Sequence, residues 1–212
     1  NMDGVAQNTD LEIDGLSVTF VFMDSTKGWS LINDDITSQL GAKFISATGG
    51  TVTTVCTNFK VHTFTGPGTF CVSCAGNPAG SDTVSYLVVA GGAGGGAGDG
   101  GAGAGGGAGG FRESKAASDS YTASPLNATS GPTYNLPVTA TGFPITVGAG
   151  GTAATNPPSG NPGGTGNTSI FSTITSAGGG GGFGGPGNNG VGGSGGSGGG
   201  SVGIQGYPSP TA

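Results

Sequence analysis

The chain contains glycine-rich tracts and a long segment that has no charged residue. Residues 121–212 contain no Asp, Glu, Lys or Arg, and glycine is densest in two tracts at 91–110 and 178–200. General acid–base catalysis, phosphate clamps and carboxylate metal cages all need ionisable side chains. The charge-free segment offers none of them, so the sequence indicates a surface and not an enzyme, with no catalytic residue, no cofactor and no metal site.

The spacing of the non-glycine residues argues against a flexible linker, although 51 Gly and 12 Pro in 212 residues are typical of one. Four of the six non-glycine residues between 91 and 110 share one phase of a three-residue period: Ala93, Asp99, Ala102 and Ala108. Three residues per turn is the polyproline II repeat, and bare glycine ridges let neighbouring helices hydrogen-bond through their backbones. We therefore expect a polyglycine II bundle. Its helices could pack within one chain or between chains.

Strand-like segments run directly into glycine at three places, 84–90, 143–147 and 169–175. Their β-branched and aromatic content favours strands, and a linker would have no reason to recur after each one. The expected repeating unit is a strand, a glycine run, a polar loop and a return. Because ordering glycine loses much conformational entropy, we expect the sheets at its base and identical partner chains to stabilise the bundle.

The N-terminal region differs in charge and pattern. Seven of the eleven acidic residues lie within the first 35 residues, so the net charge of −6 sits almost wholly at one end. Residues 16–23 predict a strand, 24–28 a turn and 29–32 the returning strand. An isolated hairpin is marginal in water, so neighbouring copies or the next domain should cover its faces. A homotrimer is the expected assembly.

The expected fold class is all-β with a polyglycine II helical bundle and essentially no α-helix. Turn signals at 49–50, 66–68 and 76–78 divide a Thr- and Val-rich region into the strands of a small antiparallel sheet or sandwich. The expected organisation is an N-terminal β shaft or oligomerisation segment, a small antiparallel β region, a polyglycine II domain with loops, and a C-terminal tail. These parts span residues 1–42, 43–90, 91–201 and 202–212.

Two motifs are better explained as ordinary structure than as sites. Asp10, Glu12 and Asp14 resemble the start of a calcium loop, but its twelfth position is Val21, where a bidentate Glu is required. Solvated charge explains these acids better than a metal. The single histidine, His62, lies in an alternating segment and is expected on a sheet face.

The three cysteines leave two alternatives open. Cys71 and Cys74 have metal-like spacing, but no second pair completes a tetrahedral site. Residues three apart on a strand point to opposite faces, which disfavours a bond between these two. A disulfide of Cys56 with Cys71 or Cys74 and three buried free thiols fit the sequence equally well.

Five motifs follow one another in a fixed order, at residues 64–70, 86–92, 109–112, 144–151 and 169–174. This succession resembles the glycine-rich domain of bacteriophage tail-fibre and appendage proteins, especially those of phages of marine bacteria, over residues 47–201. The strand, turn, Gly and Trp of residues 16–29 are similar to the shaft-to-head segments of trimeric phage fibres. Related adhesins at the fibre tips of T-even-like phages carry a polyglycine II sandwich with receptor specificity in its loops. The resemblance implies a distal, receptor-recognising role.

Two polar loops, 113–136 and 152–167, are the expected receptor-binding surface. Aromatic faces and amide groups suit sugars or the exposed loops of a porin. The candidate receptor-binding residues are Tyr121, Asn127, Tyr134, Asn135, Asn156 and Asn161. The alternative function is a non-binding structural spacer or an extracellular, virion-decorating fibre protein.

The expected partners follow from this interpretation. They are further copies of the chain, other virion or tail proteins, and a host cell-surface glycan or outer-membrane protein, at an extracellular site on the virion. Five scattered basic residues and a net charge of −6 disfavour nucleic acid. No run of 18 apolar residues predicts membrane insertion.

Overall fold

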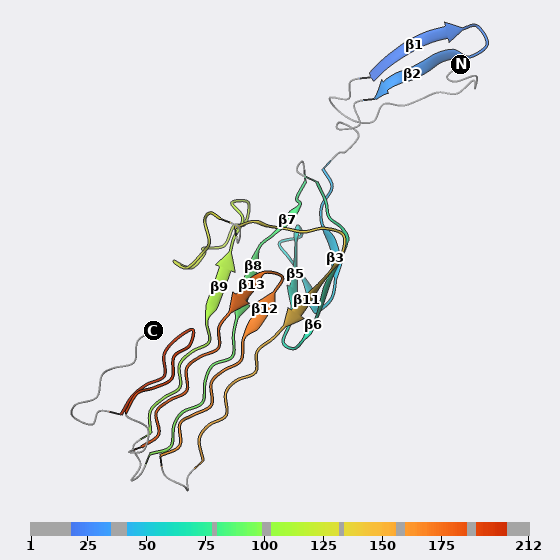
Figure 1. Ribbon diagram of the computed structural model, residues 1–212. Coiled ribbons are helices and arrows are strands. Elements are labelled where there is room, and N and C mark those ends of the chain that lie inside the picture. Colours follow the sequence, from blue (N-terminus) through green and yellow to red (C-terminus); the bar gives the residue numbers. More distant parts are fainter. Residues whose placement is uncertain are drawn as a thin grey trace.

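The architecture is all-β, as the sequence predicts. A computed structural model describes residues 18–34, 42–77, 80–98, 103–131, 134–155, 160–185 and 190–202. Within these ranges the chain forms thirteen strands and no α-helix (Figure 1). The described part accordingly has no helix that is long and apolar enough to cross a membrane.

The predicted N-terminal hairpin is present as β1 (Val18–Asp24) and β2 (Gly28–Asp34), which pair antiparallel. Asp24 closes the turn, because its Oδ1 accepts the amides of Thr26 at 2.8 Å and Lys27 at 2.7 Å. Phe22 lies opposite Trp29 with the ring centroids 5.5 Å apart, and both side chains are about half exposed. The acidic motif at 10–14 lies outside the described residues.

A five-stranded antiparallel sheet combines strands from both sides of the first glycine tract. Its order is β13 (Ile174–Ser176), β12 (Ser169–Phe171), β11 (Gly142–Thr146), β6 (Gly68–Cys74) and β3 (Ser46–Thr48). Phe70, Val72 and Val138 form its buried cluster, and Phe143 and Phe171 pack against it. The region around 43–74 therefore shares one sheet with strands that occur about a hundred residues later in the sequence.

A second layer faces this sheet. Strands β8 (Tyr86–Val89) and β9 (Phe111–Ser114) pair, and they lie against β12 and β13. Tyr86, Val88, Leu136 and Ile174 are buried between the layers. A short pair, β7 (Thr83–Val84) with β10 (Leu136–Pro137), continues this layer away from the glycine segments. The result is a small sandwich.

The hairpin of β4 (Thr51–Val55) and β5 (Phe59–Thr63) stands beside the sandwich. His62 is a sheet-face residue, as predicted. Its Nδ1 lies 2.8 Å from the carbonyl oxygen of Gly49, and its ring meets Phe70 edge-on at 5.0 Å. Gly49 and Gly50 have φ of +108° and +63°, which makes the predicted turn there a turn that only glycine accommodates easily.

The prediction of one strand over 169–175 is wrong. The chain reverses at Ser172 and Thr173, so that β12 and β13 form a tight hairpin with Phe171 opposite Ile174. Ser172 has φ of +53°, a left-handed value that a non-glycine residue rarely adopts and that no propensity rule signals here. The reversal is required because the glycine runs before β12 and after β13 are antiparallel neighbours.

Seven glycine segments continue from the strands. We number them in chain order as segments 1 (90–98), 2 (103–110), 3 (147–155), 4 (160–168), 5 (177–185), 6 (190–194) and 7 (195–201). Strands β8, β11 and β13 lead into segments 1, 3 and 5, while segments 2 and 4 lead back into β9 and β12. Figure 1 shows the segments running side by side away from the sandwich.

Hydrogen bonds in segment 1 recur at every third residue. Ala90, Ala93 and Gly96 donate to segment 2 at 2.9 to 3.0 Å. The next residues in the repeat, Gly91, Gly94 and Ala97, donate to segment 4. The carbonyl oxygens of the third set, Gly92 and Gly95, accept amides of segment 3. Because each set faces a different neighbour, the segment has three residues per turn. The predicted polyglycine II bundle is confirmed, and it forms within one chain.

Segments 1 and 5 are the centre of the bundle. Segment 5 exchanges backbone hydrogen bonds with segments 1, 2, 4, 6 and 7. Side chains are excluded from this centre: a Cβ added at Gly94 would lie 2.0 Å from the carbonyl oxygen of Thr152. Phe183 is the one side chain larger than alanine in segments 1 and 5, and it is 1% exposed. The bundle is therefore held by backbone bonds and close backbone contact.

Candidate binding surfaces

The far end of the bundle is one candidate surface, which we call the bundle tip. It is formed by Ala97, Gly103, Thr155, Asn161 and Gly184. The amide of Ala97 donates to Asn161 at 2.9 Å, and Gly103 bridges to Gly184. The Asn161 side chain donates to the Thr155 carbonyl at 3.4 Å. The connections between segments 1 and 2, 3 and 4, and 5 and 6 therefore all start from this end.

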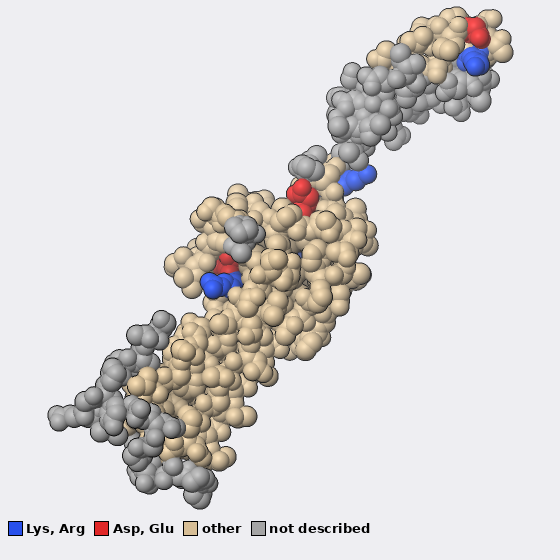
Figure 2. Space-filling model, in the orientation of Figure 1, with Lys and Arg blue, Asp and Glu red and all other residues tan. Residues whose placement is uncertain are grey.

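The bundle tip is distant from the sandwich and uncharged among its described residues. Ala97 lies eight residues beyond Val89, the last residue of β8. At about 3.1 Å per residue in polyglycine II geometry, this places the tip about 25 Å from the end of that strand. Figure 2 shows no Lys, Arg, Asp or Glu atom over the described glycine segments on the face drawn. The bundle thus carries its tip on a neutral stalk.

An ordered loop at the opposite end of the glycine segments is the second candidate surface. It follows β9 and spans residues 115–131. Glu113 holds the loop in place. The Glu113 side chain is only 7% exposed, and its Oε2 accepts the Ser124 amide at 2.8 Å. Asn127 Oδ1 accepts the Lys115 amide at 2.8 Å, and the Ala128 amide donates to the Glu113 carbonyl at 2.9 Å. These bonds fasten the loop across β9.

Two ionisable groups of this loop have shifted pKa values. Hydrogen bonds from Ser124 lower the pKa of Glu113 against the opposing effect of burial, and Tyr121 and Lys115 lower it further. Burial raises the pKa of Tyr121, and the negative charge of Glu113 adds to that effect. Glu113 is therefore a carboxylate at neutral pH, while the Tyr121 phenol keeps its proton and can donate it to Glu113. Lys115 Nζ lies 5.5 Å from the centre of the Tyr121 ring.

The structure does not bring the six sequence-predicted receptor residues together. Tyr121, Asn127, Tyr134 and Asn135 lie in the region that follows β9, whereas Asn161 lies at the bundle tip and Asn156 is outside the described residues. Sequence spacing could not reveal this, because it does not say at which end of a glycine run a loop stands. Their receptor-binding role stays a prediction.

Several of these residues have local structural roles. Asn127 and Asn161 accept or donate hydrogen bonds that close their own loops. Asn135 has φ of +46°, and its amide donates to Ser114 Oγ at 3.2 Å. The Oδ1 of Asn135 is buried without a hydrogen-bond partner among the described residues. Tyr121 is the most accessible of the described aromatic candidates, with 49% exposure.

Sequence reasoning missed a pocket beside this loop. It has a volume of about 320 Å³ and is lined by Tyr86, Arg112, Glu113, Leu126, Ala128, Thr173, Ile174 and Thr175. The lining comes from strands β8, β9 and β13, the β12–β13 turn and the loop. The tight turn at Ser172 puts Thr173 and Thr175 at the pocket, and that turn had no signal in the sequence. In the sequence, Arg112 stood out only as the last residue of the motif at 109–112.

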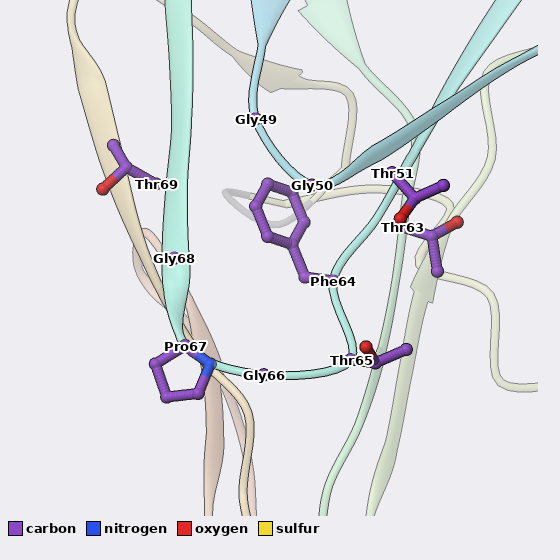
Figure 3. A pocket seen from close by; sticks show the side chains of 10 residues that line it. All are labelled: Gly49, Gly50, Thr51, Thr63, Phe64, Thr65, Gly66, Pro67, Gly68 and Thr69. Atoms are coloured by element: carbon purple, nitrogen blue, oxygen red, sulfur yellow. The ribbon is translucent and has the colours of Figure 1, made fainter.

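A second hollow surrounds Phe64 and has a volume of about 300 Å³ (Figure 3). The ring packs on backbone: a Cβ added at Gly49, Gly50 or Gly68 would lie 3.1 to 3.3 Å from its atoms. In Figure 3 the side chains of Thr51, Thr63 and Thr69 point away from the ring. The ring therefore packs beside the glycine pair and helps to fix the turn.

The cysteines are exposed free thiols in the structure, so the alternative of buried thiols is wrong. Cys56 lies in the β4–β5 turn with φ of +49°, and Cys71 and Cys74 lie on the exposed positions of β6. A disulfide from Cys56 stays a prediction. In the described ranges no three His, Cys, Asp or Glu side chains are grouped as a metal site would need.

The glycine segments lie within a region that matches a protein family. A family model described as a glycine-rich domain matches residues 65–212. The chain belongs to this glycine-rich domain family. The match covers more than two thirds of the 212 residues and includes all seven glycine segments. No curated protein and no solved structure matches the chain.

Proposed function

We propose that this chain is a virion structural protein, a phage tail-fibre or fibre-tip adhesin that uses the bundle tip for host-surface recognition. The observation that carries the proposal is the intrachain bundle, which gathers three chain connections at one end, about 25 Å from the sandwich. Backbone hydrogen bonds hold the described residues that flank those connections, and no charged side chain takes part in these bonds. Binding through such a neutral surface depends little on salt.

The receptor class in this proposal is a cell-surface glycan or an outer-membrane protein. The sequence of the three connections includes asparagine and proline but one acid only, Asp99. Amide groups donate and accept hydrogen bonds, which suits sugar hydroxyls and exposed backbone loops.

Association with further copies is the second part of the proposal. Phe22, Met23 and Trp29 on the N-terminal hairpin are 50 to 54% exposed, and a two-stranded hairpin is marginal by itself. Burial of this apolar patch between copies would stabilise it, and a homotrimer gives each copy an equivalent neighbour. Sedimentation of the full chain and of Trp29→Ser tests this: the wild type should be a trimer and the variant should dissociate.

The binding role is tested by replacing the three connections with Gly-Ser segments of equal length, one at a time. Labelled chains are then applied to a panel of bacterial cells and to whole virus particles in competition for adsorption. Replacement at the bundle tip should abolish cell binding, while replacement of residues 129–131, at the sandwich end, should leave it intact. Unchanged binding in all three variants would show that the bundle tip is not the recognition surface, and absence of wild-type binding to every strain would indicate a non-binding spacer.

A further inference from the structure

One side of the bundle carries a row of backbone amides that no described residue pairs. Segments 1 and 3 are neighbours, because the amides of Gly151 and Ala154 donate to the carbonyl oxygens of Gly92 and Gly95 at 2.8 and 2.9 Å. The amides of Gly92 and Gly95 have no acceptor among the described residues. Gly92 is exposed and Gly95 is half-buried, so this amide row lies at the surface of the bundle.

A second row of free backbone groups lies next to the first. Gly150 and Ala153 of segment 3 are exposed, and within the described ranges their amides and carbonyl oxygens make no hydrogen bond. A Cβ added at Gly150 would lie 3.5 Å from the Gly92 carbonyl oxygen, so the two rows are adjacent. We call the surface formed by Gly92, Gly95, Gly150 and Ala153 the bare face. It presents free donors and free acceptors side by side.

Packing within the chain does not require glycine on the bare face. A Cβ added at Gly92 would have its nearest neighbour at 3.8 Å, and one added at Gly95 would have it at 3.4 Å. In the bundle centre the same distance at Gly94 is 2.0 Å. Neither Gly92 nor Gly95 has a left-handed φ, so alanine there would restrict the unfolded chain and favour folding. What glycine does provide at an open surface is close approach of another backbone.

The spacing of the free groups decides which partner fits. In each row they recur at every third residue, about 9 Å apart in polyglycine II geometry. Water can satisfy single exposed peptide groups, but a protein partner needs acceptors and donors at this spacing and no bulky side chains between them. A second bare face meets both needs. Segments 1 and 3 contain no ionisable side chain, so two such faces do not repel each other.

We propose that the bare face pairs with the bare face of a second copy of this chain. A two-fold rotation places the free amides of segment 1 against the free carbonyl oxygens of segment 3 in the second copy, and the reverse. This contact repeats between chains the backbone bonding that joins segments within one chain. It goes beyond the proposed homotrimer, because three-fold symmetry contains no two-fold contact, so the pairing would join copies of two assemblies.

The contact is small, since it uses the exposed sides of two segments. Weak protein complexes bury less than about 1,200 Å² in total. We therefore expect pairing at high protein concentration and not in dilute solution. Residue-resolved amide exchange of the full-length chain measures it: exchange at Gly92 and Gly95 should slow about tenfold when about nine chains in ten are paired. Exchange at Gly91 and Gly94, which are bonded within the chain, should be slow at every concentration.

Gly92→Arg is the test variant. The open space at Gly92 accepts a side chain without displacing the bundle, and the two-fold contact would bring two like charges together. Protection of Gly95 at high concentration should be lost in this variant, while slow exchange at Gly91 and Gly94 verifies that the bundle is retained. Ser194→Arg adds the same charge at an exposed position of segment 6, which bonds only to segments 5 and 7 among the described residues. This control should pair as the wild type does.

Three results would overturn the proposal. The first is exchange at Gly92 and Gly95 that stays fast at the highest soluble concentration of the wild type. The second is protection that disappears in Trp29→Ser, because it would then come from association through the N-terminal hairpin. The third is protection that appears in dilute solution on addition of neutral oligosaccharides but never with the chain alone, because the bare face would then bind a glycan and not a second copy.

Discussion

At the scale of single residues, glycine in the bundle centre is required by space and not by backbone angle. Gly94 shows this: its φ is not in the left-handed range, yet an added Cβ would lie 2.0 Å from the Thr152 carbonyl oxygen and 2.4 Å from its carbon. Both contacts are with backbone, which cannot rotate away. One methyl group would therefore separate segments 1 and 3 and break their hydrogen bonds.

Gly94→Ala should lower the free energy of unfolding by about 3 kcal/mol or more, the upper end of overpacking effects. Gly105→Ala is the matched control, because nothing lies within 4 Å of a Cβ added there. That variant should be neutral or gain about 0.4–1 kcal/mol, since alanine restricts the unfolded chain. Urea denaturation of both variants measures the difference. Equal stability of the two would contradict the close packing of segments 1 and 3.

Glu113 makes stability depend on acidic pH. Hydrogen bonds from Ser124 hold its pKa in the folded protein below the ordinary value of 4.5. The unfolded chain therefore binds the proton first, so the stabilisation is complete above about pH 4.5 and is lost as the pH falls through the folded-state pKa. Unfolding measured from pH 6 to pH 2 should show this decline in the wild type. Glu113→Gln should flatten it, and an equally steep decline in that variant would contradict the role of this carboxylate.

At the scale of elements, the junction between strands and glycine segments rests on two buried serines that face each other, Ser169 and Ser176. Ser169 Oγ accepts the amide of Gly148 at 2.9 Å, where segment 3 begins. Ser176 Oγ is buried without a partner among the described residues, and it lies 3.0 Å from where a Gly110 Cβ would stand. Small side chains here let the strand spacing change to that of the bundle.

The two serines should respond oppositely to alanine. Ser169→Ala leaves the Gly148 amide unpaired and should destabilise the fold by about 1–2 kcal/mol. Ser176→Ala removes an unsatisfied hydroxyl and should be neutral or stabilising by up to about 1 kcal/mol. Denaturant midpoints of the two variants provide the measurement. A loss at Ser176 as large as that at Ser169 would show that its hydroxyl has a partner.

Strands and turns could be predicted from the sequence where the local residue pattern determines the structure. The N-terminal hairpin, the turn at 49–50 and the strands at 84–90 and 143–147 follow from β-branched content and glycine punctuation. The β12–β13 reversal was not predictable, since Ser172 adopts a left-handed φ that only the antiparallel glycine segments impose. The same reversal places Thr173 at the pocket, so the pocket could not be predicted from the sequence either.

At the scale of the whole molecule, a three-residue period predicted the bundle but not its connectivity. The period does not say how many copies of the chain supply the segments. It also does not say at which end of the bundle each loop lies. In the structure one chain supplies all seven segments, and segments 1 and 5 are surrounded by the others. The predicted loops at 113–136 and 152–167 therefore do not form one surface. The first lies beside the sandwich, whereas residues 152–155 and 160–167 of the second are not a loop but parts of segments 3 and 4 of the bundle.

The intrachain polyglycine II bundle is tested most directly by amide hydrogen exchange on the isolated, dilute chain, resolved by residue. Gly91 and Gly94 donate hydrogen bonds to segment 4, while the amides of Gly92 and Gly95 have no acceptor among the described residues. The predicted result is slow exchange at Gly91 and Gly94 and faster exchange at Gly92 and Gly95, independent of further dilution. Uniformly fast exchange at all four amides, or protection of Gly91 and Gly94 that appears only when the chain associates, would contradict the bundle described here.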